Sequence, residues 1–230
     1  MRLLFALQTV MLVVFAAAPA CADLISAIEV QSIAFTGTQN NNTASDGVAG
    51  WAFTAVDSFS ISALGYYDHL QDGFVDPHEI GLWRINGATS TLVATTELSA
   101  GTAAVLMGDF RYGSITPLEI TAGNDYVIGA TIGFGSGTAQ YDPTVTPSSS
   151  GWTSTSHITN VVGRFGLIFP AGSGFNNSNF PSDFGTPSDP PFLGPNFLIT
   201  SVPEPSSFAL LSSCISCLAL SHWRPRKITK

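Results

Sequence analysis

The stretch Glu79–Thr96, EIGLWRINGATSTLVATT, decides the fold class of this chain. At the start of this stretch every second residue, Ile80 and Leu82, is apolar. This alternation is the period of a β-strand with one buried face. Asn86-Gly87 separates this run from a second β-type run, and Asn-Gly in that position is the strongest short signal for a β-hairpin. The stretch therefore predicts two antiparallel strands joined by a tight turn.

Similar runs recur along the chain between Asp23 and Ser201, where we find no convincing amphipathic helix. Ala122-Gly123-Asn124 predicts a further turn. Many short strands without crossover helices predict an all-β antiparallel β-sandwich, jelly-roll-like, with an immunoglobulin-like sandwich as the second choice. The predicted strands are Ala27–Phe35, Gly50–Val56, Phe59–Tyr67, Glu79–Ile85, Ser90–Thr96, Asp109–Ile115, Asp125–Phe134, His157–Phe169 and a closing strand Gly194–Ile199.

Two stretches rich in Gly, Ser, Asn and Pro, Gly135–Gly151 and Ala171–Gly194, predict long loops. The second loop contains Phe175, Phe180, Phe184 and Phe192, so we expect it to lie on the domain.

The first 22 residues have the organisation of a secretory signal peptide. Arg2 precedes the apolar run Leu3–Ala18, and Ala20 and Ala22 form a small-x-small cleavage site. We expect an N-terminal signal helix (residues 1–22), removed by signal peptidase. A membrane anchor is the first alternative, and a lipoprotein attached through Cys21 is the second.

A second hydrophobic segment, Phe208–Trp223, is followed at once by the basic residues of 224–230 and is marginal in length for a membrane span. In front of it stands Val202-Pro203-Glu204-Pro205. This tail, residues 202–230, resembles the PEP-CTERM sorting signal of Gram-negative bacteria. The resemblance implies a single C-terminal membrane helix and cleavage at Pro203, Glu204 and Pro205 by an exosortase, an integral-membrane cysteine protease. The alternative is an ordinary tail anchor, in which Cys214 and Cys217 are small residues facing lipid.

The body, residues 23–201, is also similar to a domain of unknown function that recurs in exported PEP-CTERM proteins. The similarity covers Gly50–Ala130 and includes Gly50-Trp51-x-Phe53-Thr54 and His78-Glu79-Ile80-Gly81-Leu82-Trp83. It implies a sandwich fold and an exported location, and it implies no reaction.

Charge excludes one class of partner. The chain has 230 residues, of which only 10% are charged, and its body combines 15 acidic residues with three basic ones, Arg84, Arg111 and Arg164. A body with this balance repels a phosphate backbone, so we expect no nucleic-acid binding. The body also lacks cysteine, so it must fold without disulfides.

The densest cluster of titratable residues is Asp68–Glu79, DHLQDGFVDPHE. Oxygen ligands from Asp68, Asp72, Asp76 and Glu79 predict a Ca²⁺ site, while a solvated turn is the alternative and zinc is disfavoured because cysteine is absent. Arg111 is expected to form an ion pair with one of these carboxylates. The ring of His78 is expected to form a hydrogen bond with a neighbouring loop.

The body contains none of the common catalytic motifs, such as G-x-S-x-G, a P-loop or H-E-x-x-H. Trp51, Trp83 and Trp152 are either a sugar-stacking platform or, as we favour, core residues. We therefore expect a non-catalytic surface or extracellular-matrix protein in contact with extracellular polysaccharide, exported by the secretion machinery and sorted by an exosortase, with no cofactor. The alternative is a carbohydrate-binding module or weak glycan hydrolase with a Ca²⁺ site.

Overall fold

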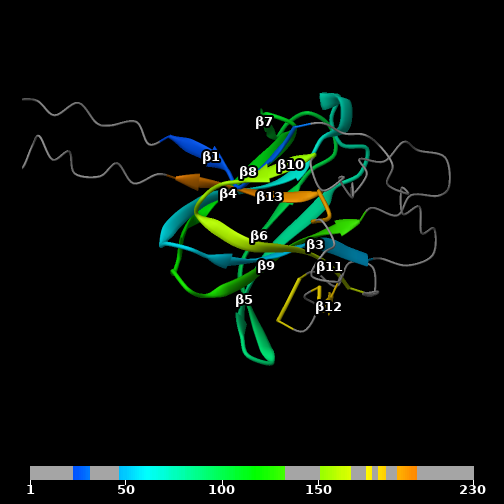
Figure 1. Ribbon diagram of the computed structural model, residues 1–230. Coiled ribbons are helices and arrows are strands. Elements are labelled where there is room, and N and C mark those ends of the chain that lie inside the picture. The colour runs from blue at the N-terminus through cyan, green and yellow to red at the C-terminus, as the bar shows by residue number, and fades with distance from the viewer. Residues whose placement is uncertain are drawn as a thin grey trace, which may run out of the picture. The chain divides into compact units, whose positions relative to one another are not determined.

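The computed structural model describes residues 23–31, 47–132, 151–166, 175–177, 181–184 and 191–200, all within the unit Asp23–Val202. The predicted signal helix and C-terminal helix lie outside these ranges. The described chain forms strands and one short 3-10 helix, η1 (His69–Gln71) (Figure 1). The strands are β1 (Leu24–Ser26), β2 (Ile28–Val30), β3 (Gly47–Ala55), β4 (Phe59–Tyr67), β5 (His78–Asn86), β6 (Thr89–Leu98), β7 (Val105–Met107), β8 (Phe110–Ile120), β9 (Asp125–Ile132), β10 (Trp152–Ser154), β11 (Ile158–Gly166), β12 (Asp183–Phe184) and β13 (Pro195–Thr200).

These strands form two large sheets and one small sheet. The five-stranded sheet has the order β1-β13-β4-β8-β7, and the six-stranded sheet has the order β12-β11-β3-β9-β5-β6. β10 and β2 form the two-stranded sheet. Neighbouring strands in all three sheets run antiparallel. The prediction of an all-β, antiparallel fold is therefore confirmed for the part of the chain that the structure describes.

The two large sheets contribute to one hydrophobic core. Phe197 on β13 packs against Trp51 and Phe53 on β3, with ring centroids 5.5 and 5.2 Å apart. Tyr66 on β4 stacks on His78 of β5 with centroids 3.9 Å apart. Because each of these contacts joins one sheet to the other, aromatic burial, a large contributor to core energetics, connects the sheets directly.

The predicted hairpin is confirmed, but its turn lies one residue later than expected. Asn86 pairs with Thr89 at the ends of β5 and β6, so the two central turn residues are Gly87 and Ala88. Gly87 has φ +62°. A two-residue hairpin turn needs positive φ at its first central position, which glycine adopts at little cost.

The second predicted turn changes sheets. It connects β8 of the five-stranded sheet to β9 of the six-stranded sheet. Gly123 has φ +76°, and its N–H donates to the carbonyl of Ala55 at 2.8 Å. The turn is therefore attached to the end of β3, beside which β9 begins.

The first predicted strand, Ala27–Phe35, differs from the structure. The chain pairs with β13 through Leu24–Ser26, breaks at Ala27 and then pairs with β10 through Ile28–Val30. The N–H of Ile28 donates to Asn196 Oδ1 at 3.2 Å. The buried amide of Asn196 on β13 thus accepts the hydrogen bond that a backbone carbonyl would otherwise accept, at the point where the chain leaves β13 and turns to β10. Predicted strand residues beyond 31, 132 and 166 lie outside the described residues.

Three glycines form a row across the six-stranded sheet. Gly50, Gly129 and Gly81 are register partners on β3, β9 and β5. A Cβ at Gly81 would lie 2.7 Å from the ring of Phe175, and one at Gly129 would lie 2.9 Å from the ring of Pro181. The row therefore lets the segment containing Phe175 and Pro181 approach the backbone of the sheet.

This contact confirms that part of the predicted loop Ala171–Gly194 lies on the domain. Phe175 packs edge-on against Trp83 at 5.0 Å, and Phe192 packs against Phe165 at 6.3 Å. Phe180 and the side chain of Phe184 lie outside the described part of the chain, as do residues 135–150 of the other predicted loop.

Candidate functional site

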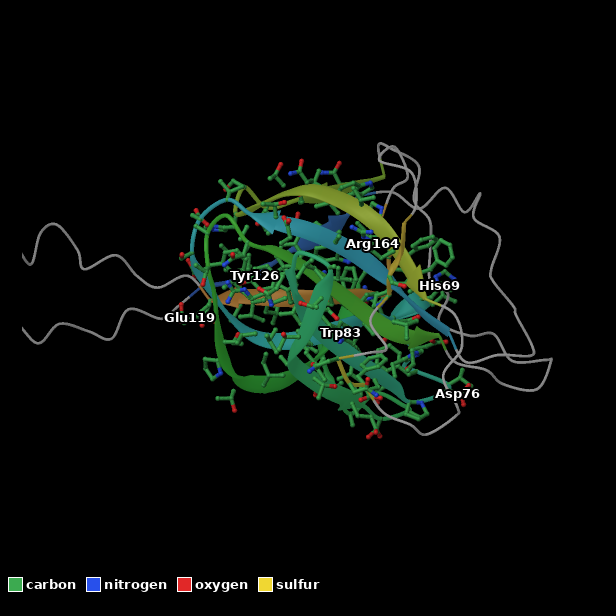
Figure 2. All side chains as sticks on the ribbon, turned by 90° about the horizontal axis from the view of Figure 1, so that it is seen from below. His69, Asp76, Trp83, Glu119, Tyr126 and Arg164 are labelled. Atoms are coloured by element: carbon green, nitrogen blue, oxygen red, sulfur yellow. The ribbon has the colours of Figure 1, made fainter. Side chains whose placement is uncertain are left out.

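The acidic segment Asp68–Glu79 connects β4 to β5 and contains η1. Figure 2 shows His69 and Asp76 at the end of the domain opposite to Glu119. Phe74 forms an isolated antiparallel bridge with Gly101, which attaches the segment to the loop before β7. The segment is therefore an ordered corner of the described structure.

Asp68 and Arg111 form a buried ion pair at this corner. Arg111 Nε lies 2.5 Å from Asp68 Oδ2, and the two side chains are 6% and 0% exposed. The carboxylate also accepts a hydrogen bond from the N–H of Gly73 at 3.1 Å. The predicted ion pair between Arg111 and a carboxylate of this segment is confirmed.

Three further hydrogen bonds from the guanidinium of Arg111 go to backbone carbonyls of two loops. Nη1 donates to Thr102 at 3.1 Å and to Ala104 at 3.0 Å, and Nη2 donates to Gln71 at 3.2 Å. One side chain on β8 thereby connects the acidic segment to the loop that precedes β7.

The same contacts hold an unusual backbone conformation. Leu70 and Gln71 have φ values of +65° and +60°, which side-chain-bearing residues rarely adopt, and Leu70 is 73% exposed. Gln71 is held by the bond from Arg111 and by its own Nε2, which donates to Asp109 Oδ1 at 3.1 Å. Backbone strain of this kind persists only where surrounding contacts over-determine the conformation.

The four predicted calcium ligands have different surroundings. Asp68 is engaged by Arg111, and Glu79 accepts from the N–H of Phe175 at 3.0 Å. Asp72 is exposed and Asp76 is half-buried. Among the residues that the structure describes, no group of three His, Cys, Asp or Glu side chains is placed to hold a metal ion. The Ca²⁺ site stays a prediction, and it requires Asp68 to exchange its arginine partner for the cation.

A calcium titration tests this prediction. A cation that binds only the folded state at a hundredfold excess over Kd stabilises it by about 2.7 kcal/mol. For a domain of this size the melting temperature would rise by roughly 5–10 °C. The titration must reach tens of millimolar, because extracellular Ca²⁺ sites bind at about 10⁻⁴–10⁻³ M. The same shift in an Asp72→Ala/Asp76→Ala variant, or no shift in the original protein, would contradict the prediction.

His78 is buried at the start of β5. Its Nδ1 lies 3.0 Å from the carbonyl of Thr131, at the end of the neighbouring strand β9 rather than in the expected loop. Because a carbonyl only accepts, Nδ1 carries the proton. Loss of hydration on burial lowers the pKa of His78, although the Thr131 carbonyl and the charge of Asp76 oppose this shift.

This lowered pKa predicts acid sensitivity. The unfolded chain binds a proton near pH 6.5 that the folded chain excludes, so the free energy of unfolding should fall as the pH drops below about 6.5. A His78→Phe variant keeps a ring against Tyr66 but cannot titrate. We expect the stability difference between the original protein and this variant to shrink from pH 7 to pH 5, measured by urea unfolding. Parallel pH profiles would show that His78 contributes nothing.

The tryptophans do not form a shared surface. Trp51 and Trp83 are fully buried, and their indole N–H groups donate to the carbonyls of Pro195 at 2.8 Å and Asn176 at 2.9 Å. Trp152 is half-buried against the core. The favoured prediction of core tryptophans is confirmed for Trp51 and Trp83, and these two cannot stack on a sugar.

Two half-open cavities border the β1–β2 segment. The first, of about 390 Å³, has mostly apolar walls from β1, β2 and the turn Met107–Phe110. The second, of about 300 Å³, lies between this segment and residues 153–157. Its wall contains His157, whose Nδ1 lies 2.8 Å from Asp57 Oδ1.

Sequence reasoning missed the pair Asp57–His157. The two residues are 100 positions apart and lie in separate turns, Asp57 before β4 and His157 before β11. Neither belongs to a motif, so the sequence alone contains no signal that would bring them together.

No family model, curated protein or solved structure matches this chain. Among the described residues, no helix has the length and apolar character needed to cross a membrane; both hydrophobic segments of the sequence lie elsewhere.

Proposed function

We propose that this is an exported, non-catalytic protein of the cell surface or extracellular matrix, built on a jelly-roll-like β-sandwich and sorted by an exosortase. The strand order supports the sandwich. Counted in chain order, the eight main strands are β1, β3, β4, β5, β6, β8, β9 and β13. Their order is first-eighth-third-sixth in one sheet and second-seventh-fourth-fifth in the other, with β11 added beside the second strand. Two interlocked Greek keys produce this order.

The observation that carries the export and sorting proposal is where the folded unit begins and ends. Its first described strand, β1, begins at Leu24, two residues after the predicted signal cleavage at Ala22, and its last, β13, ends at Thr200, two residues before Val202-Pro203-Glu204-Pro205. Cleavage at either predicted point would leave β1 and β13 complete. Signal peptidase and an exosortase are therefore the processing partners that fit this chain.

The composition of the body supports a structural role outside the cell. It folds without cysteine and carries 15 acidic residues against three arginines, of which Arg111 is neutralised by Asp68. A strongly acidic surface keeps a protein soluble and repels other polyanions. Extracellular polysaccharide is the partner class we assign, with neutral sugars favoured over anionic ones.

The test of sorting is a Pro203→Ala/Glu204→Ala/Pro205→Ala variant, compared with a Ser206→Ala/Ser207→Ala control in a host that contains an exosortase. We expect the variant to accumulate uncleaved in the membrane fraction, while the control is processed to a mature protein that starts at Asp23. Intact-mass measurement of each cell fraction gives both termini. Equal processing of the two variants would contradict sorting by an exosortase.

A further inference from the structure

We propose that the cavity between the β1–β2 segment and residues 153–157 binds a neutral sugar unit. Five of its eight lining residues carry hydroxyl groups, and the others include Glu29 and His157. Its volume of about 300 Å³ lies at the small end of the range for ligand sites, which suits one monosaccharide. The proposal does not depend on how the protein is sorted.

The imidazole of His157 is held in a defined orientation. Its Nδ1 lies 2.8 Å from Asp57 Oδ1, and its ring packs against Phe59 with centroids 5.7 Å apart. The backbone is also tied down, because the His157 carbonyl accepts from Val56 at 2.8 Å. With Nδ1 occupied by a carboxylate, Nε2 is the nitrogen available to a ligand.

Other polar groups of the cavity are also available. Glu29 is exposed, and among the described residues the side chains of Glu29, Ser154 and Ser156 form no hydrogen bond. Ser26, by contrast, is saturated: its Oγ donates to the carbonyl of Ile28 at 2.7 Å and contacts Tyr112 and Asn196. Ser26 therefore only lines the cavity, while Glu29, His157 and the two serines are the groups that would form hydrogen bonds with the ligand.

These groups define the chemistry of the ligand. A carboxylate accepts only, His157 presents Nε2, and serines both donate and accept, so the ligand must offer several O–H donors together with acceptors. Among the described residues no lysine or arginine lines the cavity, whereas Glu29 lines it and Asp57 lies behind His157. A uronate or a phosphate would be repelled, and an apolar ligand would leave the hydroxyls unpaired. A neutral hexose has many hydroxyl groups that donate and accept, carries no negative charge and is not apolar, so it fits this cavity.

The test uses the purified full chain and ligand-observed NMR titrations with the methyl glycosides of glucose, galactose and mannose, and with glucuronate. We expect saturable binding of at least one neutral glycoside with Kd on the order of millimolar, as ligand efficiencies allow for so small a ligand. Glu29→Gln and His157→Phe should each weaken binding about tenfold, since the first removes a charge-assisted hydrogen bond and the second removes the ring nitrogen Nε2. Glu97→Gln, the same exchange at an exposed site on β6, should leave Kd unchanged.

Three results would overturn the proposal: no saturable binding of any neutral glycoside, unchanged Kd in both Glu29→Gln and His157→Phe, or tighter binding of glucuronate than of the glucose derivative. Unchanged melting temperatures of the variants would show that any loss of binding is local. Because processing at Pro203-Glu204-Pro205 is measured separately, failure of the sugar site and failure of the sorting proposal are distinguishable.

Discussion

Replacing Asp68 by asparagine is expected to destabilise the protein by about 3–5 kcal/mol, because it leaves the guanidinium of Arg111 buried without a counter-charge. The two side chains are 0% and 6% exposed, so water cannot replace the lost partner. Urea unfolding of the original protein and the variant gives the difference in the free energy of unfolding.

The matched control is Asp72→Asn, which makes the same chemical change four residues later in the same loop. Asp72 is exposed, so its effect should stay within about 0.5 kcal/mol. Added salt should leave the Asp68→Asn effect unchanged, since a buried pair is screened little. Equal effects of the two variants would contradict the structural role of the ion pair.

The second large effect is expected at Phe197, where the two sheets meet. Truncation by Phe197→Ala should cost about 3–5 kcal/mol, because its ring contacts Trp51, Phe53 and Phe59 and the resulting cavity cannot close. For a chain of this length the melting temperature should fall by about 6–20 °C, which calorimetry measures.

Phe165→Ala is the control for this prediction. Phe165 is 39% exposed, while Phe197 is fully buried, so the same truncation should cost clearly less. A loss at Phe197 no larger than at Phe165 would show that the sheets do not depend on this ring for their packing.

The sequence predicted strands where the local pattern alone determines them. The predicted strand Phe59–Tyr67 coincides with β4, because turn residues bound an apolar run on both sides. Its alternation suggested one solvent-facing side, yet Ser60, Tyr66 and Tyr67 are all buried. Both faces of β4 are therefore covered, in addition to its two edges, which pair with β13 and β8. The covering of the second face depends on residues distant in the sequence.

The candidate sites show the same limit. The sequence predicted that Arg111 pairs with a carboxylate of the acidic segment, but not which one. The choice follows from register, since Arg111 is the cross-strand partner of Tyr66 on β4, two residues before Asp68. The pair Asp57–His157 was missed altogether, because β3 and β11 must first align before their flanking turns meet.

The pairing of β1 with β13 has a mechanical consequence. Leu24 lies opposite Thr200 in an antiparallel pair, so the chain enters and leaves the domain side by side (Figure 1). Tension applied between the two chain ends would open this pair from one end, loading its hydrogen bonds one after another rather than all together. Only three residue pairs join β1 to β13, so β1 would peel away at low force. The chain beyond the break at Ala27 would then carry the load through the pairing of β2 with β10. The shared core would stay intact in this first step.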